Sequence, residues 1–505
     1  MSPGNGSAMQ EFEIKYQVPP ARRAALEAAL QAGARTRRVR LQAAYFDTPG
    51  RALARAGLAL RLRKEGRRWV QTLKAAGDDA LTRFEHSVRL EAAPAVVDPA
   101  LHGGTPQGDR LLALVRSAGP LVEAYRTEVW RRLRRVKHRL GQVELALDVG
   151  EIRSGERRLP LCEFEVELVD GQPEAVLEVA GRWMARFGLW LDIRSKAERG
   201  DRLAQGLVGV PATKAAALAL PREATVAQAW QAALEATLAH LLPNVCELAQ
   251  DAPDEAGHRV EQVHQARVAL RRLRTAMRFF RGWPGVPDTR DVQEALRAVF
   301  TRLGQARDRD VVVALLEPVL TPAGLPLPDA WAPAQAGSDG VAEVLRSTEA
   351  QRLWLQLLRW RLAGLPPAAA EPFEPRATKR LRSWHRAVAA HASDFLALDD
   401  TARHGLRKRI KRLRYAVDFA GSLYEPRAVK GYLRALAAAQ ECFGQFNDLA
   451  VAQAAVVEVR APWAWYARGW LEARREALLP VCQASLQTLS EAPRFWKARY
   501  GKGRR

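Results

Sequence analysis

The sequence has few cysteines and no long apolar run, and each shortage excludes a class of protein. The four cysteines (Cys162, Cys246, Cys442 and Cys482) lie far apart with no C-x-x-C spacing, so reduced thiols are predicted rather than a zinc site or a disulfide framework. No stretch of about 18 uncharged apolar residues occurs, which argues against a membrane-spanning helix. The first eight residues lack the regions of a signal peptide. We therefore expect a cytoplasmic protein that starts at Met1 or Met9.

Acidic residues are scarce relative to basic ones. The 505 residues include 78 Lys and Arg but 56 Asp and Glu, which gives a formal net charge of +22. Charged residues at 27% and hydrophobic residues at 48% are typical of a globular chain and argue against wholesale disorder. The basic excess favours polyanionic partners such as nucleic acid, an anionic membrane surface or polyphosphate. Composition does not choose among them.

The pattern of the chain changes near its middle. Up to about residue 204 it mixes short alternating segments with turn residues, and beyond about residue 222 it consists of long helical stretches rich in Ala, Leu and Arg. Residues 206–221 carry Pro211 and Pro221 and are predicted to be a linker. The sequence therefore predicts an α+β protein with two domains, of which the second is all-α.

Charged residues alternate with apolar ones in the first domain. The pattern begins with EFEIKY at residues 11–16 and recurs around 60–63, 83–91, 143–148 and 163–168. A strand with this period places its charges on one face, and a closed barrel would gather those faces around one polar interior. Basic groups there would hold phosphate oxygens, and clustered carboxylates would hold Mg²⁺ or Mn²⁺. Basic groups, carboxylates and a divalent metal together suit phosphoryl transfer.

These residues resemble the CYTH, or triphosphate tunnel metalloenzyme, superfamily. EFEIKYQV is similar to its ExExK signature, and further motifs follow in the family's order, including YFDTP, LRLR, ELALDVG, CEFEVEL and SKAERG. The resemblance covers residues 9–205. It implies an eight-stranded antiparallel β-barrel with flanking helices, whose tunnel binds triphosphate.

The resemblance also implies roles for individual residues. The implied metal ligands are Glu11, Glu13, Glu163 and Glu165. The implied phosphate contacts are Lys15, Arg61, Arg63, Lys74, Arg83, Arg126 and Lys196, with Arg132 a further candidate because it shares strand parity with Arg126. The carboxylates that would orient these bases or serve a second metal are Glu85, Glu144, Asp148 and Glu167. A water molecule would attack the terminal phosphorus without a covalent intermediate.

The expected activity is hydrolysis of inorganic triphosphate to diphosphate and phosphate. The superfamily also includes adenylyl cyclases and thiamine triphosphatases, so both remain alternatives. A nonenzymatic polyphosphate- or nucleic-acid-binding protein is a third alternative.

The second domain contains an internal repeat. HQARVALRRLRTAMRFF begins at His264 and HGLRKRIKRLRYAVDFA begins at His404, and the same offset relates LGQARD to FGQFND. Two motifs that share one offset indicate a duplicated helical unit.

Each copy carries a basic stripe at helical spacing. The stripe residues are His264, Arg267, Arg271 and Arg274 in the first copy and His404, Arg407, Lys411 and Arg414 in the second. The run RHGLRKRIKRLR contains no acid, unlike a salt-bridged solvated face. Two such helices facing each other would form a basic groove for a polyanion. Nucleic acid is the rival ligand, but the stripes lack interleaved aromatic residues.

The repeated segments resemble the CHAD family, a conserved histidine α-helical domain. The resemblance covers residues 222–500, with halves at about 222–345 and 372–500, and implies bundle-like halves that bind inorganic polyphosphate. We expect the matching histidines, His264 and His404, to bond phosphate or a neighbouring acid. Asp308 and Asp448 are expected to be structural partners of the stripes. Polyphosphate binding would also associate the protein with polyphosphate granules.

Overall fold

The computed structural model describes residues 7–33, 35–77, 82–91, 96–251, 257–325, 327 and 340–497, without the side chains of residues 7–10, 76 and 305–310. Contacts divide the chain into two compact units. Unit 1 comprises Met1–Ala212, Leu242–His258 and Ala342–Leu362, and unit 2 comprises Thr213–Leu241, Arg259–Val341 and Ala363–Arg505. Each unit is described by itself.

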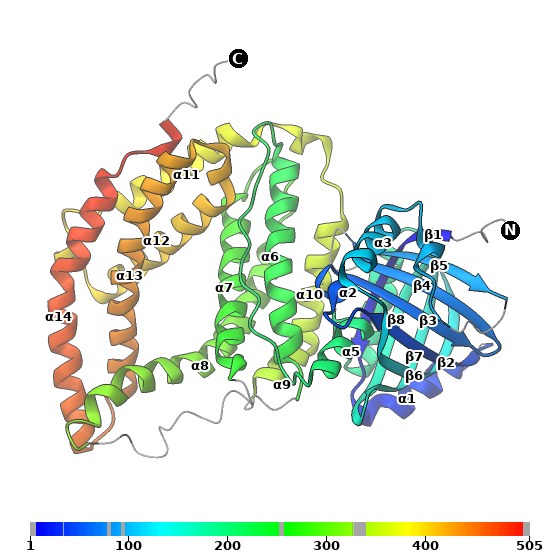
Figure 1. Ribbon diagram of the computed structural model, residues 1–505. Helices are drawn as coiled ribbons and strands as arrows, with labels where there is room; N and C mark the ends of the chain where they lie inside the picture. The colour runs from blue at the N-terminus through cyan, green and yellow to red at the C-terminus, as the bar shows by residue number, and fades with distance from the viewer. Residues whose placement is uncertain are drawn as a thin grey trace. The chain divides into compact units, whose positions relative to one another are not determined.

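Unit 1 is built on a closed antiparallel barrel (Figure 1). Its strands are β1 (Ser7–Gln17), β2 (Arg37–Asp47), β3 (Leu58–Glu65), β4 (Arg68–Ala76), β5 (Thr82–Leu90), β6 (Val122–His138), β7 (Gly141–Ser154) and β8 (Arg157–Gly171). They follow the order β5-β4-β3-β2-β6-β7-β8-β1, and pairing of β5 with β1 closes the ring. The two-residue strand β9 (Trp190–Leu191) adds to β1. The predicted eight-stranded antiparallel barrel is confirmed.

One apolar cluster of unit 1 lies outside the barrel, between the strands and the helices that cover them, whereas Leu41, Ala43, Tyr45 and Val129 form a second cluster on the inner face. Short helices include α1 (Arg23–Gln31), α2 (Ala52–Arg55), α3 (Pro106–Ala118) and α4 (Glu174–Phe187). On β3 and β4, Leu60 and Leu73 are fully buried together with Leu111 of α3. Because strand side chains alternate between faces, burying the apolar side against helices turns the charged side inward.

Helix α5 (Lys196–Gln205) begins beside the barrel through a local capping motif. Ser195 Oγ accepts a hydrogen bond from the Glu198 amide at 3.0 Å, the first half of a capping box. A Cβ on Gly200 would lie 2.2 Å from the Tyr125 ring, so only glycine permits the helix to pack this closely. These contacts fix Lys196 in the first turn of α5.

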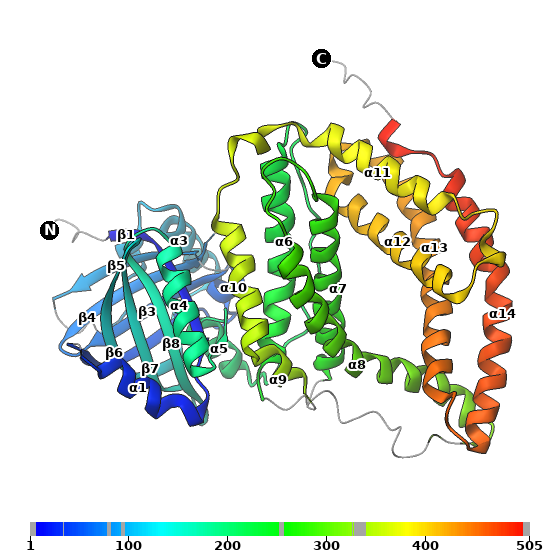
Figure 2. The same cartoon turned by 180° about the vertical axis from the view of Figure 1, so that it is seen from behind.

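Unit 2 is helical (Figure 2). The helices after the barrel are α6 (Val226–Leu248), α7 (His258–Phe279), α8 (Arg290–Leu320), α9 (Val341–Arg346), α10 (Thr348–Leu362), α11 (Phe373–Ala389), α12 (Asp400–Ala420), α13 (Pro426–Val456) and α14 (Pro462–Glu491). Of these, α9, α10 and the end of α6 belong to unit 1. None of the described helices is long and apolar enough to cross a membrane.

The internal repeat is visible as two matching helix pairs. Helices α7 and α8 have 22 and 31 residues, and α12 and α13 have 21 and 31 residues. Apolar side chains of α8, α13 and α14 share one buried cluster that includes Leu316, Leu449 and Leu471. The predicted all-α domain with a two-fold repeat is confirmed.

Candidate functional site

Strand register brings opposite charges together on the inner face of the barrel. The directly opposed pairs are Glu11 with Arg83, Lys15 with Glu165, Lys74 with Glu85, and Arg131 with Asp148. They line a cavity of about 300 Å³, which we call the tunnel. Other sequence-predicted residues that line it are Glu13, Arg61, Arg63, Glu144, Glu167 and Lys196. Alternating charge in the sequence thus becomes a polar interior.

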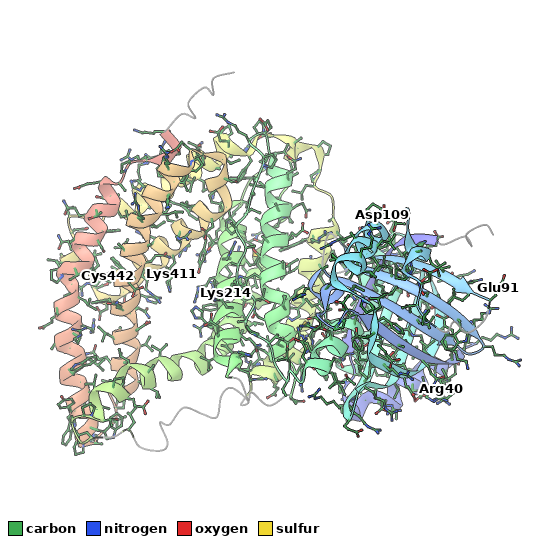
Figure 3. The ribbon with its side chains drawn as sticks, viewed as in Figure 1. Arg40, Glu91, Asp109, Lys214, Lys411 and Cys442 are labelled. Carbon is green, nitrogen blue, oxygen red and sulfur yellow. The ribbon has the colours of Figure 1, made fainter. Side chains whose placement is uncertain are left out.

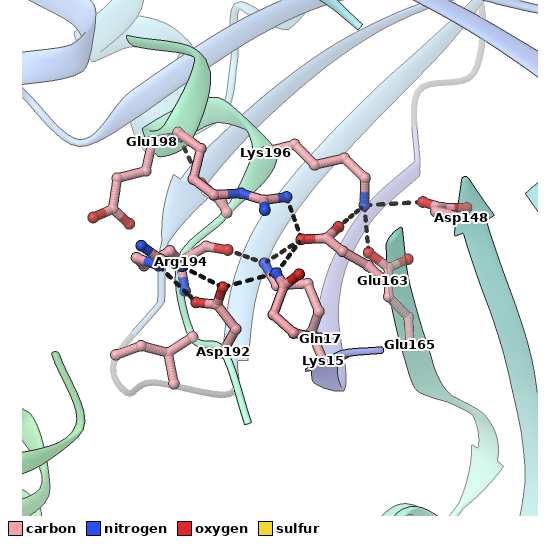
Figure 4. Close-up of polar contacts among 12 residues, drawn as sticks. Lys15, Gln17, Asp148, Glu163, Glu165, Asp192, Arg194, Lys196 and Glu198 are labelled. Atoms are coloured by element: carbon pink, nitrogen blue, oxygen red, sulfur yellow. Dashed lines mark hydrogen bonds and ion pairs between the residues drawn. The ribbon is translucent and has the colours of Figure 1, made fainter. Parts of the chain in front are cut away.

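Three carboxylates converge on the ammonium of Lys196 (Figure 4). Lys196 Nζ lies 2.9 Å from Asp148, 2.6 Å from Glu163 and 2.6 Å from Glu165. One oxygen from each acid lies within 4.8 Å of the others, and all three residues are buried. Such a buried acidic triad is consistent with the divalent metal site of CYTH enzymes.

Although burial opposes them, neighbouring cations lower the pKa values of two members of the triad, Asp148 and Glu165. Burial alone would lower the pKa of Lys196, but the carboxylates of Asp148, Glu163 and Glu165 outweigh it and raise that pKa well above its ordinary value. Burial would likewise raise the pKa of Glu165, yet Arg131 and Lys196 hold it well below its usual range. The opposing charges therefore compensate for their shared desolvation.

Two arginines that sequence reasoning missed complete this cluster. Arg131 binds both oxygens of Asp148 at 2.6 Å and reaches Glu165 at 2.5 Å, and Arg199 of α5 binds Glu163. Arg131 is hard to find because β6 carries arginines at both strand parities. Arg199 lies in the SKAERG motif but was not singled out.

A second acidic set lies in the same tunnel and is less fully neutralised. Burial and the neighbouring charges of Glu165 and Glu11 raise the pKa of Glu13. Burial, followed by the charges of Glu11 and Glu13, raises the pKa of Glu167 to about 8. Glu11 pairs with the ammonium of Lys74 at 2.8 Å. Carboxylates that repel one another in an all-oxygen setting fit a hard divalent cation.

Four further cations of the tunnel lie near carboxylates. Lys74 bonds Glu85 at 2.5 Å, and Arg61 lies 4.0 Å from the same residue. Arg63 pairs with Glu65. Arg83 lies 4.0 Å from Glu13 and donates to the Ile193 carbonyl at 3.0 Å.

Arg126 does not belong to this set, which corrects one expectation. Its guanidinium is 64% exposed and pairs with Glu123 outside the tunnel. Arg132, which shares its parity, pairs with Glu27 of α1 at 2.9 Å. The inward side chains of β6 are Thr127, Val129, Arg131 and Leu133.

A buried network of hydrogen bonds and ion pairs begins at Lys15, which lines the tunnel. Lys15 donates to the Arg194 carbonyl, and burial lowers the pKa of Lys15. Arg194 pairs with Asp192 at 2.8 Å and with Glu247 near the end of α6 at 3.3 Å. Arg194, two residues before Lys196, is therefore fixed by contacts with both β1 and α6.

In unit 2 the basic stripes act on each other. Phe300 of α8 lies beneath three stripe cations of α7, with centroid distances of 4.8 Å to Arg267, 5.8 Å to Arg271 and 5.7 Å to Arg274. Burial and nearby cations, among them Arg407 and Arg271, lower the pKa of Lys411 to about 7. Figure 3 labels Lys411 on α12. Lys408 and Arg412 lie outside the predicted stripe. Burial and nearby cations, among them Arg274 and Arg278, lower their pKa values as well.

Two stripe residues have other surroundings. Arg414 pairs with Asp418 and is therefore neutralised. His404 contacts Asn447 through its Nδ1 at 3.1 Å rather than an acid. The side chain of Asp308 lies outside the described residues, whereas the charge of Asp448 acts on Lys411.

The fold and the site define a class: a charged β-barrel tunnel suited to phosphate anions, followed by a duplicated helical domain with a basic surface. Comparison with known proteins agrees. The CYTH domain model matches residues 9–199 and the CHAD domain model matches residues 228–457. The chain therefore consists of a CYTH domain followed by a CHAD domain.

Individual proteins are similar to one part of the chain or the other. An inorganic triphosphatase of Haemophilus influenzae is 26% identical over 160 residues, which is 31% of this chain and 44% of that protein; the chain thus matches less than half of that relative's length. The CHAD domain from Ricinus communis is 32% identical, with 56% of this chain and 99% of that chain covered and a TM-score of 0.49. A Hippeastrum protein named as an adenylyl cyclase, with a dominant triphosphatase activity, is 20% identical over 39% of this chain and 96% of its own, with a TM-score of 0.30.

Proposed function

We propose that the tunnel hydrolyses inorganic triphosphate to diphosphate and phosphate in the presence of Mg²⁺ or Mn²⁺, and that the CHAD domain binds inorganic polyphosphate. One observation carries the enzymatic part: a single cavity is lined by lysines and arginines together with carboxylates of two sets, Glu11, Glu13 and Glu167 in one and Asp148 and Glu165 in the other. The distant homology to an inorganic triphosphatase supports the same reaction.

The lining of the tunnel favours an inorganic substrate. A volume of about 300 Å³ is at the small end of the range for ligand pockets, about 300–1,000 Å³. Among the described lining residues the aromatic one is Tyr45, and its ring already stacks on Tyr125 at 4.7 Å. Adenine or a thiamine ring would therefore find no open aromatic face in the tunnel.

The chain's own residues supply binding, orientation and proton acceptance. Arg61, Arg63, Lys74 and Arg83 bind phosphate oxygens by exchanging their carboxylate partners for the substrate. A water molecule oriented by a tunnel carboxylate attacks the terminal phosphorus, its proton passes to that carboxylate, and the diphosphate oxygen leaves on the opposite side. Glu11, Glu13, Glu163 and Glu165, with Asp148, would hold the divalent cation, which would neutralise charge developing on the phosphoryl oxygens.

Phosphate release from tripolyphosphate tests the proposal. The wild-type protein, a Glu11→Ala/Glu13→Ala variant and a control variant with two exposed acids removed, Glu91→Ala/Glu156→Ala, are compared with Mg²⁺, with Mn²⁺ and with chelator. We expect metal-dependent release that the first variant loses and the control retains. Parallel reactions with ATP and thiamine triphosphate test the alternatives. No release with any substrate or metal would refute the enzymatic proposal.

The polyphosphate part rests on the facing stripes of α7 and α12. Burial and nearby cations of α7 and α12 lower the pKa values of Lys411 and Arg412, so a bound anion would stabilise this surface. We expect Arg271→Gln/Lys411→Gln to weaken binding of labelled long-chain polyphosphate about tenfold, and the exposed control pair Lys379→Gln/Lys430→Gln to leave it unchanged. Equal competition by single-stranded RNA would favour the nucleic-acid alternative.

A further inference from the structure

Two grooves flank α4 on the outside of the barrel in unit 1. The first, of about 650 Å³, lies beside the end of β6 and is lined by residues that include Arg134, Lys137 and Arg186. The second, of about 590 Å³, lies between α4 and α10 and is lined by residues that include Arg352 and Arg359. Figure 2 shows α4 and α10 side by side. None of the lining residues lines the tunnel.

The two grooves share residues and therefore adjoin. Glu178 and Arg182 line both of them. Gly181 of α4 lies in the second groove and faces Leu355 of α10, with no side chain between them. An extended ligand can consequently pass from one groove to the other across α4.

Positive charge dominates this surface. The basic lining residues are Arg134, Lys137, His138, Arg139, Arg182, Arg186, Arg352 and Arg359, and the one acidic lining residue is Glu178. Glu178 is already bound by Arg139 at 2.7 Å and His138 at 3.2 Å. Arg134 is also committed, because it donates to the Ala29 carbonyl at 3.1 Å. The local cations therefore outnumber the available carboxylate.

Four cations remain to meet a ligand. Lys137, Arg182, Arg352 and Arg359 are exposed, and no described residue forms an ion pair with any of them. Guanidinium groups bind phosphate oxygens through two parallel hydrogen bonds. Exposed like charges along one groove repel each other until an anion neutralises them.

The aromatic residue of the first groove does not offer a stacking platform. Trp183 is stacked between Phe164 at 5.1 Å and Phe187 at 5.4 Å, with interplanar angles of 29° and 28°. Binding of single-stranded nucleic acid ordinarily needs aromatic faces for its bases. The paired grooves offer charge along a continuous path but no stacking face. A chain of linked phosphates fits such a surface, because it carries regularly spaced charge and no bases.

We propose that the paired grooves around α4 form a second binding site for long-chain inorganic polyphosphate, separate from the tunnel and from the α7–α12 surface. The site uses none of the residues assigned to either proposed function. Its success or failure is therefore independent of triphosphate hydrolysis.

Local chemical protection tests the proposal on the full-length protein. The acetylation rate of Lys137 is measured by mass spectrometry with long-chain polyphosphate, with RNA of equal total charge, and without ligand. Three proteins are compared: wild type, Arg182→Gln/Arg359→Gln, and a control with two exposed arginines of α3 replaced, Arg110→Gln/Arg116→Gln. Tripolyphosphate hydrolysis and thermal unfolding of the same samples verify that the tunnel and fold are intact.

We expect polyphosphate to slow acetylation of Lys137 in the wild type and the control, and the Arg182→Gln/Arg359→Gln variant to need about fivefold more polyphosphate for the same protection. Absence of protection in the wild type would overturn the proposal. An equal shift in the control would show a general charge effect and would also overturn it. Equal protection by RNA would assign the grooves to nucleic acid instead.

Discussion

Replacement of Lys196 by methionine would remove the ammonium at the centre of the acidic triad while keeping an unbranched side chain. Lys196 is 14% exposed and contacts three carboxylates at 2.9, 2.6 and 2.6 Å. Removing one partner of a buried ion pair costs about 3–5 kcal/mol. Arg131 and Arg199 remain, so we expect the lower end, about 3 kcal/mol, which corresponds to a fall in Tm of about 6–12 °C for a domain of this size.

The loss should depend on pH in a defined direction. Although burial opposes them, Arg131 and Lys196 lower the pKa values of Asp148 and Glu165 in the wild type. The resulting stabilisation is present above the unfolded carboxyl pKa, about 4, and is lost as the pH falls through the depressed folded values. In Lys196→Met the carboxyl pKa values rise, so protonation relieves the repulsion. The difference in Tm should be largest at pH 8 and smaller at pH 5.

Divalent metal should partly reverse the loss. With the ammonium gone, the triad offers more negative charge to Mg²⁺, and a ligand at about 100 times its Kd adds about 2.7 kcal/mol to the free energy of unfolding. Calorimetry with and without Mg²⁺, beside the exposed control Lys430→Met, measures this. A Lys196→Met protein that unfolds like the wild type at pH 8 without metal would refute the reasoning.

Three further predictions concern other parts of the molecule. Arg131→Gln should lower kcat/KM for tripolyphosphate about a hundredfold, whereas Arg126→Gln should leave it unchanged; equal losses would contradict the assignment of the two faces of β6. Because burial and nearby cations lower the pKa of Lys411 to about 7, its wild-type contribution should make unfolding in urea more costly as pH rises above 7, and Lys411→Met should remove this rise. Glu247→Gln should lower kcat more than it raises KM by loosening the Arg194 segment, and unchanged kinetics would make Glu247 merely structural.

The barrel could be predicted from the sequence because the alternation that specifies its strands is a local pattern. Alternation of charge and apolarity specifies which face of each strand is buried, and on β3 and β4 the apolar face packs against α2 and α3. The metal and phosphate candidates on β1, β3, β4, β5 and β8 follow from that alternation, and the structure places all of them except Glu163 in the lining of one cavity; Glu163 is buried and contacts Lys196. Their individual roles remain predictions.

Alternation did not predict which residues of β6 face inward, because charged residues occur at both parities of that strand. In β6 the run WRRLRRVKH has arginines at both parities, so alternation could not separate inward Arg131 from outward Arg126. Arg199, Asp192 and Arg194 lie beyond the regular strands, where their positions depend on how α5 and β9 pack on the barrel. In the helical domain, helical spacing identified the stripes. It did not predict that Arg414 is paired with Asp418, which is an ordinary i,i+4 contact.

The cations of the two domains differ in whether an acid already holds them. In the tunnel, Lys74, Arg131 and Lys196 contact carboxylates before any substrate arrives, so binding exchanges one buried anion for another. On the α7–α12 surface, burial and neighbouring cations lower the pKa values of Lys411 and Arg412 to about 7 and about 10. An anion bound there relieves repulsion between these cations, and salt screens its attraction to them. Added salt should therefore weaken polyphosphate binding far more than it raises KM for tripolyphosphate.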